Sequence, residues 1–368
     1  MKIVIAPDSF KECLCAADVA RRVAAGVRKA IPDAEIVCCP MADGGEGTVD
    51  AVLGATEAVS VSVVVANPVG APVAARYCVW RDTAVIEMAE ASGLERLSPH
   101  ERNPLLTHTF GTGELIAHAL QAGIRNFVVA VGGSATVDGG TGMARALGYG
   151  FTDVSGAPTP LGGGYLSDIA QITPACLSGA VSAAEFRVAV DITGPLLGPK
   201  GAAQMYGPQK GATPDMVNRL EAGLGHLQQY LYSVGMLSPL SVPGDGAAGG
   251  LGMGVRAFLG GTICRGAEVV ADLVGLDDAL RGADWVITGE GRTDAQSAEG
   301  KVCTYVASLA KSRGGQSLLL SGSISDDASP ATGAFTAWRG ISAPNVPLAV
   351  SMRDAGYNLE RAAADFFS

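Results

Sequence analysis

The sequence predicts an α/β protein whose main sheet is parallel and flanked by helices. Two observations lead to this fold class. Near both ends of the chain, short apolar runs typical of buried strands alternate with segments of helical periodicity. The middle of the chain is less regular, which indicates a second domain inserted into the first. An alternating strand and helix order is typical of parallel sheets, because each helix carries the chain back to the start of the next strand.

The opening segment predicts a strand, a helix and a second strand. The runs KIVIA (residues 2–6) and EIVCC (residues 35–39) are short and apolar, as expected of buried strands. Between them, apolar residues recur at helical spacing from Val19 to Ile31, until Pro32 ends the run. This order is that of a βαβ unit.

The same pattern recurs further along the chain. NFVVAV (126–131), DWVIT (284–288) and QSLLLSG (316–322) are predicted as strands, and KVCTYVASLAKSRG (301–314) is predicted as a helix. Because these elements repeat the alternation of strand and helix, we expect a parallel sheet flanked by helices.

The middle of the chain predicts a separate domain. Its strand-like pieces ARYCVW, TAVIEMA and FRVAVDI are joined by long loops rich in glycine and proline, and such loops in a compact protein are usually either functional or wrongly assigned as loops. A length of 368 residues accommodates two domains. We therefore expect residues 1–67 and 284–368 to form one discontinuous α/β domain, with residues 68–283 inserted and a cleft between the two domains.

Composition excludes several classes of partner. The formal charge of −10, with no block of Lys or Arg, argues against nucleic acid or an anionic membrane as the main partner. Apolar stretches are short or broken by Asn, Pro and Gly, so we expect neither a signal peptide nor a membrane segment, and a cytoplasmic location. The eight cysteines lack the spacing of a zinc site or a disulfide scaffold and are expected to be reduced thiols.

Glycine placement is the most informative local feature. The 50 glycines cluster beside acids or hydroxyls after predicted strands, as in DGGEG (43–47), GGSATVDGG (132–140), GDGAAGGLG (244–252) and GEGRTD (289–294). In parallel sheets, ligands bind at the carboxyl ends of strands, where glycine lets the backbone approach and N–H groups face an anion. Carboxylate oxygens suit Mg²⁺, which bridges nucleotide phosphates. The clusters therefore predict a site for phosphate together with a metal ion.

The standard nucleotide and catalytic motifs are absent. Lys301 is followed by Val302, where a P-loop needs Ser or Thr, and GTGELI (111–116) follows polar residues where a dinucleotide motif follows a strand. The four histidines form no recognisable motif, and no G-x-S-x-G occurs. Ser134 in GGSAT is better suited to donating a hydrogen bond to an oxyanion than to nucleophilic attack.

A set of longer strings resembles one known family. In chain order these strings are IAPDSFKECLCAADVA, PMADGGEGTVDAVL, VIEMAEASGLERL, FGTGELIAHAL, VGGSATVDGGTGMARALG, GPQKGA, GAAGGLG and ADWVITGEGRTDAQSAEGK. Together they resemble the bacterial glycerate kinases of the type that phosphorylate D-glycerate at O2. The resemblance runs over nearly the whole chain, and several of the strings are long and unusual, so it is specific.

The resemblance implies a kinase that uses ATP and Mg²⁺ to convert D-glycerate to 2-phosphoglycerate. It also implies a flavodoxin-like parallel-sheet domain built from both chain ends, an inserted second α/β (α+β) domain, and an active site in the cleft. Three departures from the family pattern bear on substrate contacts. Thr193-Gly194 stands where Asn is usual, Val137 precedes Asp138 where Asn is usual, and Asp245 replaces a smaller residue.

The chemistry selects the candidate residues. Phosphoryl transfer needs in-line positioning, neutralisation of phosphate charge and an acceptor for the hydroxyl proton, and a glycerate carboxylate is best held by Arg or Lys. With the resemblance, these needs indicate as catalytic residues Lys11, Asp43, Glu46, Asp191, Glu290, Asp294 and Lys301. Candidates for binding substrate or nucleotide are Asp8, Ser9, Gly44, Gly45, Gly133, Ser134, Asp138, Lys210, Gly289, Gly291 and Arg292. Candidate Mg²⁺ ligands are Asp43, Glu46 and Asp191.

Structural explanations compete with these functional ones. Lys11 and Lys210 also fit solvated surface lysines, Asp138 and Asp191 also fit turn residues, and the polar segment 290–301 also fits an ordinary loop.

The stretch MADGGEGT, residues 41–48, keeps two interpretations. In one, Asp43 is the N-cap of a helix that begins near Gly45. Glu46 then lies in the first turn, where the positive end of the helix dipole favours an acid. In the other, the glycines bring the backbone close to a ligand, while Asp43 and Glu46 orient Mg²⁺, its waters or the glycerate hydroxyls, one of them serving as base.

Two alternatives to a glycerate kinase remain open on the sequence. One is a kinase for another small hydroxyacid, and the other is a non-catalytic protein that binds a hydroxyacid or nucleotide on the same fold. The many acids and lysines at predicted strand ends favour an enzyme. The oligomeric state is left open, a homo-oligomer included.

Overall fold

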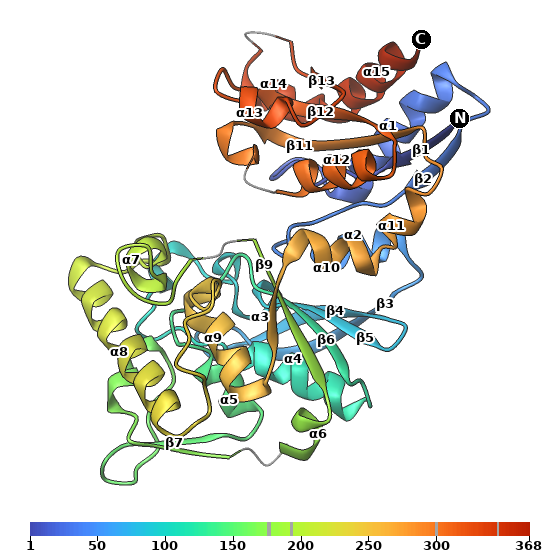
Figure 1. The fold of residues 1–368 in the computed structure, drawn as a ribbon. Helices are drawn as coiled ribbons and strands as arrows, with labels where there is room; N and C mark the ends of the chain where they lie inside the picture. Colours follow the sequence, from blue (N-terminus) through green and yellow to red (C-terminus); the bar gives the residue numbers. More distant parts are fainter. Residues whose placement is uncertain (175–177, 192–193, 299–300, 344–345) are drawn as a thin grey trace. The chain divides into compact units, whose positions relative to one another are not determined.

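The chain folds into two compact units (Figure 1). The structure is a computed structural model that describes residues 1–174, 178–191, 194–298, 301–343 and 346–368. The terminal unit consists of Met1–Asp43, Gly47–Glu57 and Ala267–Ser368, and the middle unit consists of Gly44–Glu46 and Ala58–Gly266.

The terminal unit is built on a parallel sheet of five strands among the described residues. Its strands are β1 (Lys2–Ile5), β2 (Glu35–Cys38), β11 (Trp285–Thr293), β12 (Gln316–Ile324) and β13 (Ala337–Gly340). Their spatial order is β2-β1-β11-β12-β13. Numbered within the unit, this is 2-1-3-4-5, the flavodoxin-like order. The predicted α/β fold class is therefore confirmed, although β2 is an edge strand that is only half-buried.

Helices cover both faces of this sheet (Figure 1). The helices of the terminal unit are α1 (Ala16–Ala30), α2 (Thr48–Ala55), α10 (Gly266–Leu273), α11 (Leu276–Ala279), η5 (Ala295–Ala298), α12 (Val302–Ser312), α13 (Ser329–Thr332), α14 (Leu348–Arg353) and α15 (Ala355–Phe367). Leu318 and Leu320 of β12 pack with α1 and with Leu359 of α15, whereas Leu319 packs with Ala307 of α12. Because successive strand residues point to opposite faces, α1 and α15 cover one face and α12 covers the other.

The middle unit has a mixed sheet, with the order β10-β9-β6-β5-β4-β3 among the described residues. Its strands are β3 (Val59–Ala66), β4 (Pro72–Trp80), β5 (Thr83–Glu87), β6 (Asn126–Ala130), β9 (Glu185–Val190) and β10 (Thr262–Arg265), with β7 (Gly150–Thr152) and β8 (Gln171–Thr173) as a separate antiparallel pair. The four strands from β5 to β10 in this sheet are parallel, and β3 and β4 are antiparallel.

One large apolar core fills the middle unit. The helices of this unit are α3 (Ala89–Ser92), η1 (Leu94–Arg96), η2 (Pro99–Glu101), α4 (Phe110–Gln121), α5 (Thr141–Ala146), η3 (Gly163–Asp168), α6 (Ser178–Ser182), α7 (Ala202–Tyr206), η4 (Pro208–Lys210), α8 (Pro214–Ser233) and α9 (Ala247–Leu259). Several of them lie in segments that the sequence predicted as long loops, because such short helices leave no helical periodicity in the sequence.

The predicted domain boundaries differ from the bounds of these units. The sequence placed residues 59–66 in the first domain, but β3 pairs with β4 of the middle unit from Val59 opposite Val79 onwards. The cause is a tight hairpin, in which Gly70 has a φ of +87° and the Asn67 N–H donates to the Ala71 carbonyl at 2.7 Å. At the other boundary, residues 267–283 belong to the terminal unit.

Two further observations concern the chain as a whole. In the part of the chain that the structure describes, no helix has both the length and the apolar character needed to cross a bilayer. The cysteines within the same described ranges are free.

Candidate active site

Gly44 and Gly45 of the DGGEG stretch belong to the middle unit and lie at the carboxyl ends of two parallel strands. The Val131 N–H, just after β6, donates to the Gly44 carbonyl at 3.1 Å. Gly44 has a φ of +88°, and a Cβ there would lie 2.9 Å from the backbone of Ala189 in β9. A side chain at Gly132 would likewise collide with Gly45. Glycine is therefore required where these segments meet.

Lys210 of η4 contacts Ser134, which lies in the loop that follows β6. Lys210 is 2% exposed, and its Nζ donates to Ser134 Oγ at 2.7 Å and to the Thr136 carbonyl at 2.8 Å. The explanation of Lys210 as a solvated surface lysine is therefore wrong. Burial lowers the pKa of the Lys210 ammonium to about 7, and the charge of Asp138 opposes this shift.

Asp138 lies inside the unit, with no exposed surface. Its Oδ2 accepts hydrogen bonds from the N–H and hydroxyl of Thr109, both at 2.8 Å, and from the Gly142 N–H at 3.1 Å. The Gly140 N–H donates to Oδ1 at 3.2 Å. Asp138 therefore orders the loop from within, and its direct contact with a ligand stays a prediction.

The charge of Asp138 also affects the pKa values of buried basic side chains near it. Burial lowers the pKa of His108 and of Arg145, and the charge of Asp138 opposes both shifts. Because a buried charge is stable only when it is compensated, this aspartate balances the positive charge of Lys210 and its neighbours. Thr109 and His108 escaped the sequence analysis, since THTF carries no recognised motif.

Asp43 and Glu46 lie on either side of the glycine pair. Asp43 is half-buried and Glu46 is exposed. The interpretation of Asp43 as a helix cap is wrong, because α2 begins at Thr48 and its N-cap residue is Gly47, with a φ of +90°.

Asp191 follows β9 directly and is exposed. Burial, and secondarily the charge of Asp191, raises the pKa of the Tyr206 hydroxyl in α7. Tyr206 is a neighbour that sequence reasoning missed, because its segment carries no motif apart from its glycines.

Two of the three departures from the family pattern lie inside the middle unit. Val137 is fully buried in the apolar core. Asp245 is also fully buried, and Arg256 Nη1 donates to its two carboxylate oxygens at 2.6 and 2.8 Å. The charge at Asp245 is thus compensated by a buried ion pair, whose rupture would leave an uncompensated charge. Thr193 lies outside the described residues.

In the terminal unit, the candidate residues gather at the carboxyl ends of β1 and β11. The Asp8 N–H donates to the Gly289 carbonyl at 2.8 Å, and the Ser9 N–H donates to Asp8 Oδ1 at 2.6 Å. A Cβ at Gly291 would lie 3.6 Å from the backbone N of Lys11. The predicted residues after these two strands are therefore neighbours, and the Lys11 side chain is exposed.

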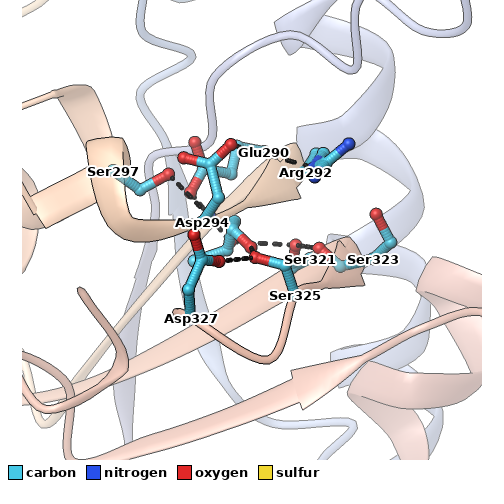
Figure 2. A network of polar contacts seen from close by, with 9 residues as sticks. Glu290, Arg292, Asp294, Ser297, Ser321, Ser323, Ser325 and Asp327 are labelled. Carbon is cyan, nitrogen blue, oxygen red and sulfur yellow. Dashed lines mark hydrogen bonds and ion pairs between the residues drawn. The ribbon is translucent and has the colours of Figure 1, made fainter. Parts of the chain in front are cut away.

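Glu290 lies in a network of polar contacts that extends into β12 (Figure 2). The Thr293 hydroxyl lies 2.8 Å from Glu290 Oε1 and 2.9 Å from Ser321 Oγ, and the Ser321 hydroxyl donates to the Ser323 carbonyl at 2.7 Å. Burial raises the pKa of the Glu290 carboxyl, while hydrogen bonds from Thr293 and Ser297 and the charge of Lys301 oppose that rise. The sequence analysis named none of the serines of SGSIS (321–325) as candidates: Ser321 was part of the predicted strand 316–322, and Ser323 and Ser325 follow it.

Two of the candidate cations, Arg292 and Lys301, lie near the same network. Arg292 Nε is 3.8 Å from Asp294 Oδ2, with the arginine side chain 68% exposed, so this ion pair contributes little to stability (Figure 2). Lys301 is the N-cap residue of α12. The terminal unit thus presents Lys11, Arg292 and Lys301 among its candidates, beside the acids Glu290 and Asp294.

Comparisons with known proteins agree with this chemistry. The model of the glycerate kinase family matches residues 3–368. "Glycerate 2-kinase" of Escherichia coli (strain K12) is 44% identical over 329 residues, covering 89% of this chain and 86% of that protein. "Glycerate kinase" of Bacillus subtilis (strain 168) is 42% identical over 368 residues, covering 99% of this chain and 96% of that protein.

A solved structure is similar over the full length. It is a crystal structure from Salmonella typhimurium LT2, provisionally described as glycerate kinase 2, with a TM-score of 0.90 and 42% identity, covering 100% of this chain and 97% of that one. Fold and relatives together define the class of protein as a kinase, an enzyme that transfers a phosphoryl group. Within that class, the chain belongs to the glycerate kinase family.

Proposed function

We propose that this kinase transfers the γ-phosphoryl group of ATP to O2 of D-glycerate and so produces 2-phosphoglycerate. The observation that carries this proposal is the 44% identity, over 89% of the chain, to the Escherichia coli protein named for phosphorylation at the 2 position. Membership of a kinase family implies ATP as the phosphoryl donor. We place the reaction in the cytoplasm, with small molecules and no nucleic acid or membrane as partners, and leave a homo-oligomer open.

The candidate cations supply the positive charge that both substrates need. Lys11, Arg292 and Lys301 are proposed to contact phosphate oxygens or the glycerate carboxylate. In a chain with a formal charge of −10, such local cations are what capture an anionic ligand. Stabilisation of developing charge by such groups usually contributes most to the catalysis of phosphoryl transfer.

The middle unit is proposed to supply groups that approach ligand atoms closely. Gly44 and Gly45 let the DGGEG stretch approach β9 and the loop after β6 closely, and Gly133 in that loop is exposed, so a ligand could approach its backbone. Ser134 adds a hydroxyl donor in the same loop. Backbone N–H groups and hydroxyls held in this way suit the oxygens of an anion.

Mg²⁺ is proposed to arrive with the nucleotide. Among the described residues, no three His, Cys, Asp or Glu side chains form a ready-made metal cluster. This fits Mg²⁺, which commonly keeps several waters and takes one or two carboxylates besides the substrate phosphates. Asp43, Glu46 and Asp191 are the proposed partial ligands. When bound, the ion would neutralise phosphate charge.

A carboxylate is proposed to accept the proton of the glycerate hydroxyl. Asp43 and Glu46 are the proposed pair, one orienting the hydroxyl and the other taking its proton. Glu290, whose pKa is raised by burial, and Asp294 are proposed to orient the cations of the terminal unit.

The direct test is ADP release from ATP with a matched set of acceptors in the presence of Mg²⁺. We expect turnover with D-glycerate, weaker turnover with D-lactate, which keeps the carboxylate and the 2-hydroxyl, and none with 3-hydroxypropionate, which lacks the 2-hydroxyl. A preference for another hydroxyacid would assign a different acceptor. Binding of D-glycerate and ATP without any ADP release would assign a binding protein instead.

A further inference from the structure

The Lys210 side chain is enclosed within the middle unit and contacts one loop. It leaves the short helix η4 beside Gly211, whose φ is +93°, and it is 2% exposed. Its ammonium binds two groups that are two residues apart in the loop after β6, the Ser134 hydroxyl at 2.7 Å and the Thr136 carbonyl at 2.8 Å. A lysine so enclosed does not act as a solvated charge. Its two hydrogen bonds hold the loop in place.

The direction of the bond to Ser134 follows from the chemistry of the ammonium. When Lys210 is protonated, its ammonium group has donors and no lone pair, so Ser134 Oγ accepts from Lys210; the dissociation constants below are therefore measured at about pH 6, below the pKa of about 7. The serine hydrogen is then left to point at another acceptor. In the described part of the chain, no hydrogen bond donated by this hydroxyl is found. The fully buried carboxylate of Asp138 supplies the negative charge that favours the ammonium form of Lys210.

The loop around Ser134 is held from several sides. The Leu94 N–H donates to the Gly133 carbonyl at 2.8 Å, and the Thr107 hydroxyl donates to the Ala135 carbonyl at 2.8 Å. With the bond from Lys210 to the Thr136 carbonyl, three carbonyl oxygens of the loop are occupied by donors from elsewhere in the unit. The backbone that carries Ser134 is therefore fixed on both sides of this residue.

Ser134 also lies where a ligand is expected. It follows β6 at the carboxyl edge of the parallel strands, where ligands bind in such sheets. Gly132, two residues before it, packs against Gly45 of the DGGEG stretch. The neighbouring Gly133 is exposed, so the loop reaches the surface here.

We propose that Lys210 is a positioning residue, whose ammonium commits the Ser134 hydroxyl to donate a hydrogen bond to an anionic oxygen of a bound substrate. The oxygen belongs to a phosphate of ATP or to the carboxylate of glycerate. This inference rests on the proposed function for the identity of the ligands. Lys210 itself does not contact the ligand.

The test is the dissociation constant of each substrate alone, measured by isothermal titration calorimetry with D-glycerate and with ATP plus Mg²⁺. Ser134→Ala should weaken one of the two by at least about 10-fold, the size expected for a hydrogen bond to a charged group, and leave the other nearly unchanged. Ser134→Thr, which keeps a hydroxyl, should restore binding. The ligand affected identifies the source of the anionic oxygen.

The lysine is tested by the same measurement. Lys210→Met should weaken the same substrate as Ser134→Ala, and the double variant should bind it no worse than Lys210→Met alone, because both changes remove one interaction. Lys210→Gln, which keeps two N–H donors, should bind better than Lys210→Met. If Lys210→Met does not fold, as judged by circular dichroism, Lys210→Gln takes its place in the cycle.

A matched control separates ligand binding from folding. Thr159 is also buried in the middle unit, and its hydroxyl also accepts a hydrogen bond from a cation, Arg145 Nη2 at 2.9 Å. Thr159→Val should lower the melting temperature and leave both dissociation constants unchanged.

Three results would overturn the proposal. They are wild-type affinity for both substrates in Ser134→Ala, additive losses in the double variant, and a wild-type protein that binds neither substrate. If the predicted pattern of affinities is found and D-glycerate is nevertheless not phosphorylated, the proposed function fails while this inference stands.

Discussion

At Asp43, a helix-capping role can be distinguished from the catalytic role that we propose for Asp43 and Glu46. Since Gly47 and not Asp43 is the N-cap of α2, replacing the Asp43 carboxylate costs no helix cap. Asp43→Asn should therefore fold normally and lower kcat by at least about 100-fold, the usual contribution of a positioned base. Glu46→Gln should be impaired in the same direction. Steady-state kinetics with D-glycerate and ATP, beside thermal melts, measure both effects. Wild-type turnover in Asp43→Asn would remove this stretch from the catalytic machinery.

Lys210 gives a prediction about pH and stability. Its pKa falls from an ordinary 10.5 to about 7 in the folded protein. Between these values the unfolded chain holds a proton that the folded chain has released, so this lysine makes the free energy of unfolding rise with pH across that window. Below about pH 7 both states are protonated and the contribution is constant.

Lys210→Met should remove that contribution. Urea denaturation at about pH 7 and about pH 9.5 should show a smaller rise in the free energy of unfolding for the variant than for the wild type. Comparing the two proteins cancels the titration of cysteines and other shared groups. Equal rises would show that Lys210 does not titrate in this range.

Residue types were predicted better than their surroundings. The sequence identified Lys210, Ser134 and Asp138 as candidate polar groups of the site. It did not indicate that the lysine is buried or that Asp138 is enclosed by Thr109 and the glycine N–H groups. Burial here depends on contacts between residues far apart in the chain, such as Lys210 with Ser134, and no local pattern encodes these.

At the scale of elements, the start of α9 shows what glycine clusters do. Ala248, Gly249 and Gly250 are all in the left-handed region, with φ values of 52°, 69° and 90°. The Gly249 carbonyl accepts from the Gly139 N–H at 3.1 Å, and a Cβ on Gly249 would overlap the Thr136 carbonyl. This turn therefore supports the loop to which Lys210 binds.

Substitutions in this turn should distinguish the cost of a left-handed backbone conformation from the cost of a Cβ that overlaps the Thr136 carbonyl. Gly249→Ala should destabilise the protein by more than about 2 kcal/mol, because a left-handed alanine alone costs roughly 1–2 kcal/mol and the collision adds to it. Ala248→Gly should be neutral or stabilising by up to about 1 kcal/mol. Urea denaturation measures both changes.

Gly235 provides the control for Gly249. It has a φ of +72° and nothing within 4 Å of a Cβ, so Gly235→Ala carries the left-handed cost without a collision. If Gly249→Ala were no more destabilising than Gly235→Ala, the packing of the turn against the loop would not matter to stability.

At the scale of the whole molecule, the alternating pattern was sufficient for the fold class and insufficient for the boundaries. The strands near both chain ends were predicted, and they pair in the flavodoxin-like order. β3 was placed with the chain ends, because its apolar run looks like any strand and only its hairpin with β4 reveals its partner. The position of Glu46 in the middle unit was likewise beyond reach, since it depends on the pairing of Gly44 with Val131.

The central claim is that this member of the glycerate kinase family phosphorylates D-glycerate at O2. It is tested most directly by the proton-coupled phosphorus NMR spectrum of the product formed from D-glycerate, ATP and Mg²⁺. A phosphate on O2 couples to the single methine proton and should give a doublet, which is the result we expect. A triplet would place the phosphate on the methylene oxygen O3 and contradict the claim, as would a spectrum with no phosphate ester at all.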